Sequence, residues 1–145
     1  MKQDLERKLR TLKLSGMAEA LTVRNQEAIS SQLAYMDFLE LLLEDELAKR
    51  RDRLYSRRLR AAHIPEMKSL ENFDWSFNPK LPKTLIFDLA TARFINHNGG
   101  VLLLGSPGTG KTHLATALTV AAIQAGYTAL YISAFDLVQN LAEPI

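Results

Sequence analysis

The stretch Val101–Ala115, VLLLGSPGTGKTHLA, constrains the fold of this chain more than any other part of it. It consists of a short apolar run, a glycine-rich turn and the beginning of a helical pattern. A continuous apolar run next to glycine is typical of a strand buried in a parallel sheet, so we predict a strand over 101–104. A helix is expected over about 111–125, followed by a second strand over 129–132.

The glycine-rich turn matches the pattern G-x-x-x-x-G-K-[ST] at every fixed position. Glycines let the backbone curl so that successive N–H groups point at phosphate oxygens, and the helix that follows adds unpaired N–H groups and a partial positive charge. The side chain of Lys111 can reach the β- and γ-phosphates, and the hydroxyl of Thr112 can bind Mg²⁺, which prefers oxygen ligands. We therefore predict a site for ATP and Mg²⁺ formed by Gly105, Ser106, Pro107, Gly108, Thr109, Gly110, Lys111, Thr112 and His113. The alternatives are a glycine turn without a ligand and, for His113, a role in helix packing only.

Hydrolysis of a bound nucleotide needs an acidic residue on a further strand, which holds Mg²⁺ and polarises water. Asp45 and Asp88 follow apolar runs, but both runs precede the phosphate loop. Asp136 follows the loop, but it lies past the second predicted strand, where it fits the start of a helix. We therefore predict no catalytic residue among these 145 positions, and whether the chain is an ATPase stays open.

The region before the loop has helical spacing. Leucines recur at helical intervals from residue 2 onward, and a long helix is expected over about 32–62, because Pro65 restricts the residue before it. We predict an α/β chain in which a helical N-terminal module (1–63) and a linker (64–80) precede part of a phosphate-loop core with an incomplete parallel sheet (81–145). Within the core, helical spacing is also predicted over 82–97.

The net charge of +2 conceals a basic segment. Seven basic residues fall within twelve positions, and Asp52 is the single acid among them: Lys49, Arg50, Arg51, Arg53, Arg57, Arg58 and Arg60. Four of the arginines share one helical stripe, which could neutralise phosphates of a DNA duplex regardless of its sequence. The alternative is a solvated helix whose acids come first and whose bases come last, as suits its dipole.

Composition excludes some classes of site. The chain has no cysteine, so it has no disulfide and no thiolate metal site, and its three histidines are scattered. No apolar run approaches the roughly 20 residues that span a bilayer, and charged residues follow Lys2 where a signal peptide would be apolar. We expect a cytoplasmic protein without a membrane partner.

Three aromatic residues alternate in the linker: Phe73, Trp75 and Phe77. They could cover the adenine ring of a nucleotide, but packing within the linker is the simpler role.

Three stretches together resemble the IstB-like family: GSPGTGKTHLATAL, FDWSFNPKLPKTLIFDLATARFI and LAKRRDRLYSRRLRAAHIP. The resemblance covers essentially the whole chain. It implies an AAA+ ATPase fold, binding of ATP and Mg²⁺, and a role as helper of an insertion-sequence transposase, with DNA and the transposase as partners and homo-oligomers in the full-length family. Members of the family continue past the second core strand, so the chain resembles a truncated N-terminal piece.

Three other functions stay open. A DnaC-like helicase loader has the same core and a different partner. A DNA-binding helical module could carry an inert phosphate loop. A phosphate-loop kinase of a small substrate is disfavoured by the long, basic N-terminal region.

Overall fold

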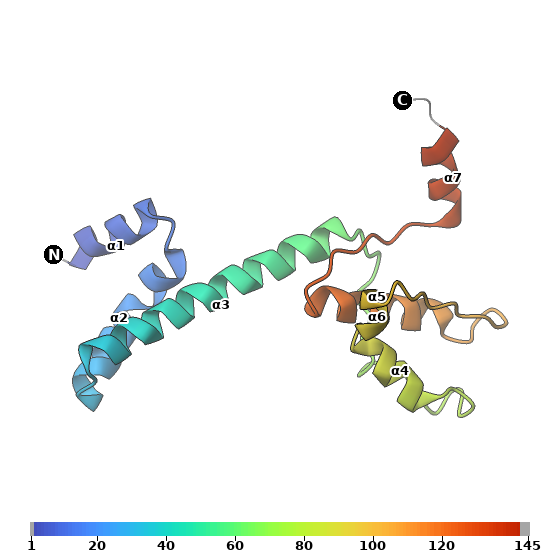
Figure 1. The fold of residues 1–145 in the computed structure, drawn as a ribbon, viewed down its shortest axis with the longest axis horizontal. Coiled ribbons are helices and arrows are strands. Elements are labelled where there is room, and N and C mark those ends of the chain that lie inside the picture. Colours follow the sequence, from blue (N-terminus) through green and yellow to red (C-terminus); the bar gives the residue numbers. More distant parts are fainter. Residues whose placement is uncertain (1, 143–145) are drawn as a thin grey trace. The chain divides into compact units, whose positions relative to one another are not determined.

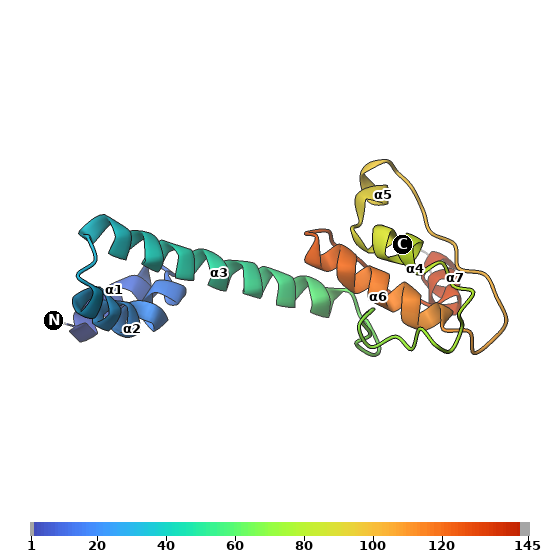
Figure 2. The ribbon, with the colours of Figure 1, turned by 90° about the horizontal axis from the view of Figure 1, so that it is seen from below.

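The computed structural model describes residues 2–142, which form seven helices and no strand (Figures 1 and 2). The helices are α1 (Lys2–Thr11), α2 (Ser15–Ser31), α3 (Tyr35–Ala61), α4 (Lys83–Ala90), α5 (Arg93–Asn96), α6 (Lys111–Gln124) and α7 (Ala134–Ala142). The chain divides into two compact units, Met1–Leu54 and Tyr55–Ile145, and the division falls within α3.

The first unit is built from α1, α2 and the first part of α3. In both views α2 lies along the beginning of α3 (Figures 1 and 2). Met17 and Leu21 of α2 pack against Leu42 of α3, and Leu9 of α1 covers this cluster. Because these residues recur at helical intervals, each helix turns one apolar face inward.

Polar contacts also join α2 to α3. Arg24 of α2 donates two hydrogen bonds to the carboxylate of Asp45, at 2.8 and 3.0 Å. The hydrogen bonds from this guanidinium lower the pKa of Asp45. Glu46 is buried beside the first turn of α2 and forms an ion pair with Arg50.

The core of the second unit lies between α4, α6 and the segment before α4. Its buried residues are Leu70, Phe73, Ile86, Leu114 and Ala117. Helix α6 carries apolar residues on several faces and buries half of its fourteen positions. It is therefore the central element of this unit, and the phosphate loop precedes it directly.

Two sequence predictions are corrected. The helix predicted over 82–97 is interrupted: α4 ends at Ala90, and Ala92, with a left-handed φ of +60°, is the N-cap of α5. Ala92 is only 2% exposed, so close packing holds this strained residue in place. The apolar spacing gives no sign of such a break.

The strands predicted over 101–104 and 129–132 are absent from the described residues, which contain no β-ladder. A strand exists only where a neighbour pairs with its N–H and C=O groups. Within residues 2–142 the only inter-segment backbone bond of either stretch runs from the amide of Tyr131 to the carbonyl of Ala62. Neither stretch pairs with another strand within the described residues, and Leu102 and Leu104 are 80% and 82% exposed.

None of the helices in residues 2–142 is both long and apolar enough to cross a bilayer.

Candidate functional site

The phosphate-loop motif forms a turn that leads directly into α6. Gly108 and Gly110 have φ values of +77° and +85°, which glycine adopts without the steric cost that other residues incur. Gly110 is the N-cap of α6, and no side chain caps this end of the helix. The amide of Leu114 donates to the carbonyl of Gly110 at 3.0 Å, and this is the first hydrogen bond of the helix. The amides that come before Leu114 in the first turn therefore have no carbonyl partner within α6.

The polar side chains of the loop converge on the carbonyl oxygen of Ser106. The ammonium of Lys111 donates to this oxygen at 2.6 Å, and the hydroxyl of Thr109 donates to it at 2.8 Å. Lys111 also lies 3.3 Å from the Thr109 hydroxyl. The loop therefore gathers one fixed positive charge and a helix N-terminus at the same place, a combination that attracts anions.

Lys111 borders two hollows of the second unit. One has a volume of about 460 Å³ and brings Gly105, Thr109 and Lys111 beside apolar residues of α4. The other has a volume of about 280 Å³ and includes Thr112. Of the loop residues that line neither hollow, Ser106, Pro107 and Gly108 are exposed at the surface and Gly110 is half-buried.

His113 is turned toward the linker. Its Nε2 lies 2.8 Å from the carbonyl oxygen of Ser69. A carbonyl only accepts hydrogen bonds, so Nε2 carries the proton and donates. The ring also meets Phe73 edge to face, with the ring centroids 5.1 Å apart. These contacts join positions 40 or more residues apart, and no local pattern in the sequence signals them.

Of the three linker aromatics, Phe73 is buried in the core, Trp75 is half-buried beside it, and Phe77 is 64% exposed. For Phe73 the structure agrees with packing, the simpler of the two sequence interpretations.

The acids that sequence reasoning considered as magnesium ligands are engaged elsewhere. Asp45 pairs with Arg24, and Asp88 pairs with Arg93 at 2.7 Å. Asp136 accepts a hydrogen bond from the Ser133 hydroxyl at 2.6 Å in the first turn of α7, where the sequence suggests a helix start. The described part of the chain has no cluster of three or more acidic or histidine side chains that could hold a metal ion.

The basic residues of α3 fall into two groups. The first group makes contacts within the first unit: Lys49 pairs with Glu19, Arg50 pairs with Glu46, and Arg53 donates to the hydroxyl of Ser15. Arg51, Arg57, Arg58 and Arg60 make no ion pair or side-chain hydrogen bond within residues 2–142. Charge spacing alone does not separate the two groups, because the partners of Lys49 and Arg53 lie on α2, and only the Arg50–Glu46 pair lies within α3.

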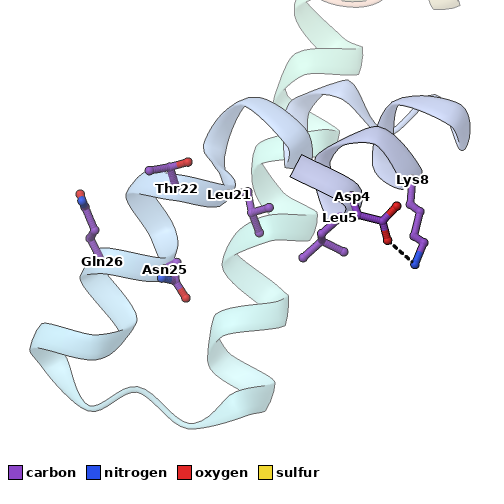
Figure 3. Close-up of a pocket in the computed structure, with 7 residues that line it drawn as sticks. All are labelled: Asp4, Leu5, Lys8, Leu21, Thr22, Asn25 and Gln26. Atoms are coloured by element: carbon purple, nitrogen blue, oxygen red, sulfur yellow. Dashed lines mark ion pairs between the residues drawn. The ribbon is translucent and has the colours of Figure 1, made fainter. Parts of the chain in front are cut away.

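A further pocket lies between α1 and α2, far along the chain from every predicted site residue (Figure 3). Leu5 and Leu21 point toward each other there, and the Asp4–Lys8 ion pair lies at its edge. Thr22, Asn25 and Gln26 complete a polar rim around a volume of about 490 Å³. This rim holds neither a glycine turn nor an unpaired cation, so it lacks the features of a phosphate site.

Comparison with known proteins identifies the family. The sequence profile of the IstB-like ATP binding proteins matches residues 7–144. The chain belongs to this family. It is 38% identical over 138 residues to a protein of Mycobacterium tuberculosis named as an ATP-binding protein in an insertion sequence, covering 95% of this chain and 55% of that protein.

Two further IstB-like relatives show the same extent of similarity. A Pseudomonas aeruginosa protein named for insertion sequence IS21 is 36% identical, with 95% of this chain and 52% of the relative covered. A Geobacillus stearothermophilus protein named for insertion sequence IS5376 is 33% identical, with 97% and 56% covered. The chain therefore spans about half the length of these curated relatives.

Proposed function

We propose that this IstB-like chain binds ATP on Gly105–Thr112 and acts as an ATP-binding helper of DNA transposition. The observation that carries the proposal is the geometry of the loop. The glycine turn, the uncapped N-terminus of α6 and the Lys111 ammonium lie together at one open surface. Backbone amides and one lysine are the groups that bind nucleotide phosphates in proteins with this loop.

A magnesium ion fits the donor set beside this loop. Mg²⁺ keeps several waters and takes few protein ligands together with phosphate oxygens. Thr112 is an exposed residue next to Lys111, and its hydroxyl would supply one such ligand. When bound, the ion would neutralise charge on the β- and γ-phosphates.

The names of the relatives favour transposition over helicase loading, because each of those described above is named for an insertion sequence. A helper of this kind works on DNA with a transposase. We assign the DNA contact to the basic part of α3, and most directly to Arg51, Arg57, Arg58 and Arg60, because they make no competing ion pair or side-chain hydrogen bond within the described residues.

Titration calorimetry with ATP tests the nucleotide site. Replacing Lys111 with Ala removes the loop cation, and hydrogen bonds to charged groups contribute about 1.5–3 kcal/mol. We therefore expect Lys111→Ala to weaken ATP binding by about tenfold or more. ATP and ADP should bind, whereas adenosine should not, because recognition falls on the phosphates.

Lys83→Ala is the matched control, because Lys83 is an exposed lysine of the same unit that lies over Trp75 and makes no hydrogen bond to a loop residue within residues 2–142. It should leave ATP affinity unchanged. Equal ATP affinity in the wild type and in Lys111→Ala would show that the proposed site is wrong. Replacing Thr112 with Val should weaken ATP binding in the presence of Mg²⁺ and leave binding in a chelator unchanged.

A further inference from the structure

The ring of Phe73 lies directly against Gly110 of the phosphate loop. A Cβ atom built on Gly110 would come within 2.7 Å of Phe73 Cε2 and 3.0 Å of Phe73 Cζ. Contacts this short mean that the ring fills the space beside the glycine backbone. Phe73 comes from the segment before α4, so a residue 37 positions upstream packs against the last glycine of the motif.

The same segment holds the first turn of α6 at a second point. His113 donates to the carbonyl of Ser69, and its ring packs edge to face on Phe73. Phe73 itself is 7% exposed and belongs to the buried cluster that includes Leu114 of α6. The N-terminal end of α6 is therefore braced on one side by two residues of this segment.

The position of Gly110 determines how the phosphate groups of a nucleotide would meet the protein. Gly110 is the N-cap of α6 in a left-handed conformation, and Lys111 follows it directly. Its carbonyl accepts the first hydrogen bond of the helix, from Leu114. A shift of Gly110 would therefore move the first-turn amides and the base of the Lys111 side chain together.

We infer that Phe73 is a positioning residue for the phosphate loop: its ring sets the backbone of Gly110, and through it the amides and the lysine that would bind phosphate. The inference rests on the proposed nucleotide binding and adds to it a residue outside the motif. Phe73 does not touch the nucleotide in this role. It acts through Gly110, so its removal changes phosphate binding without removing a phosphate ligand.

Trp75 offers a reporter of the same contact. It is the only tryptophan of the chain, and its ring meets Phe73 edge to face with the centroids 4.9 Å apart. A ligand that tightens the loop around phosphate would press on Phe73 and change the surroundings of the indole. ATP binding should therefore alter the fluorescence of Trp75 in the wild type.

The test compares Phe73→Leu with Ile86→Val. Both residues belong to one buried cluster, but Ile86 comes from α4, and its replacement leaves the Phe73–Gly110 contact in place. Hydrogen exchange of the Leu114 amide is measured without nucleotide, because this amide bonds to Gly110. We expect faster exchange in Phe73→Leu than in Ile86→Val. We also expect the ATP affinity to fall about tenfold in Phe73→Leu and to stay unchanged in Ile86→Val. A loss of this size is typical when a residue that supports a ligand site is removed.

The fluorescence change of Trp75 on adding ATP should disappear in Phe73→Leu and persist in Ile86→Val. Equal Leu114 exchange in the two variants would overturn the inference, whatever the ATP result. A wild type that does not bind ATP would instead overturn the proposed function, and the exchange result would still decide the positioning role.

Gly110→Ala provides a second variant if Phe73→Leu does not fold, as judged by its circular dichroism. The added methyl would force the ring away while every core residue stays present. It should also speed Leu114 exchange and weaken ATP binding. Where both variants fold, their effects should be non-additive, because both disturb the Phe73–Gly110 contact; Gly110→Ala also adds backbone strain of its own at the φ of +85°. A folded Gly110→Ala with unchanged ATP affinity, or strictly additive effects, would contradict the inference.

Discussion

Glu46 of α3 caps the N-terminus of α2 by accepting a hydrogen bond from the backbone amide of Gly16 at 2.7 Å. The same oxygen accepts from the amide of Met17 at 3.3 Å. Leu14 stands at the N-cap position and has no side-chain acceptor, so a residue 30 positions after Gly16 performs this role. The other oxygen of Glu46 pairs with Arg50 at 2.8 Å.

This cap predicts a specific dependence of stability on pH. The hydrogen bond from Arg50 lowers the pKa of Glu46, burial opposes that shift, and the amides of Met17 and Gly16 add to it. Because the folded-state pKa lies below the usual value of 4.5, the stabilisation is complete above about pH 4.5 and is lost as the pH falls through the folded value. We expect Glu46→Gln to flatten the acid side of the unfolding curve, measured by urea titration at several pH values.

At neutral pH the same substitution should lower the free energy of unfolding by about 1.5–3 kcal/mol, because it removes hydrogen bonds to a charged group. Glu40→Gln is the control, since Glu40 is an exposed glutamate of the same helix. An acid transition that Glu46→Gln leaves unchanged would show that other carboxylates dominate it.

Gly16→Ala should destabilise the first unit, although alanine is the better helix former by about 1 kcal/mol. The added Cβ would lie 2.7 Å from the Cα of Glu46 and 2.8 Å from the carbonyl oxygen of Asp45. These are backbone atoms of α3, so the two helices would have to move apart, at a cost of about 1–3 kcal/mol.

Thermal unfolding followed by circular dichroism measures this effect. Gly100→Ala is the matched control, because a Cβ at that position has no neighbour within 4 Å. Its melting temperature should stay close to that of the wild type. A Gly16→Ala protein more stable than the wild type would mean that helix propensity outweighs the contact with α3.

Two exposed arginines of α3, Arg57 and Arg60, should contribute to DNA binding. Arg57→Ala with Arg60→Ala removes two exposed cations that make no ion pair within residues 2–142. The double substitution should weaken binding to duplex DNA of any sequence and reduce the slope of log K against log salt by about two. Fluorescence anisotropy at several salt concentrations measures both quantities.

Arg93→Ala is the control for this experiment, because Arg93 is an exposed arginine of α5 that pairs with Asp88. It should change neither the affinity nor the slope. A slope that the α3 double variant leaves unaltered would place the DNA contact elsewhere on the protein.

Local patterns in the sequence predict two of the helices, those after residue 32 and after the phosphate loop, to within a few residues. The long helix expected over 32–62 is α3, Tyr35–Ala61, and the helix expected after the phosphate loop is α6, Lys111–Gln124. Both have strong helical spacing or a clear stop signal, and such signals act over a few residues. The motif also predicts a glycine turn. The structure has this turn, and Gly108 and Gly110 adopt positive φ values there, which glycine permits without strain.

Contacts between distant residues account for what the sequence does not predict. Apolar runs alone suggest strands over 101–104 and 129–132, but a ladder also needs a neighbouring strand, which the described residues lack. The Glu46 cap, the Phe73–Gly110 contact and the break at Ala92 likewise depend on tertiary packing. Local propensity carries no information about partners that lie dozens of positions away.

The hydrogen bond from Lys111 to the Ser106 carbonyl makes phosphate binding an exchange of partners. The ammonium and the Thr109 hydroxyl already share one acceptor within the loop, so an arriving anion must compete with the protein's own oxygen. The lysine is thereby kept at the mouth of the site instead of extending into solvent. The contribution of Lys111 to nucleotide affinity would therefore be the difference between its new bond to phosphate and the internal bond that this new bond replaces.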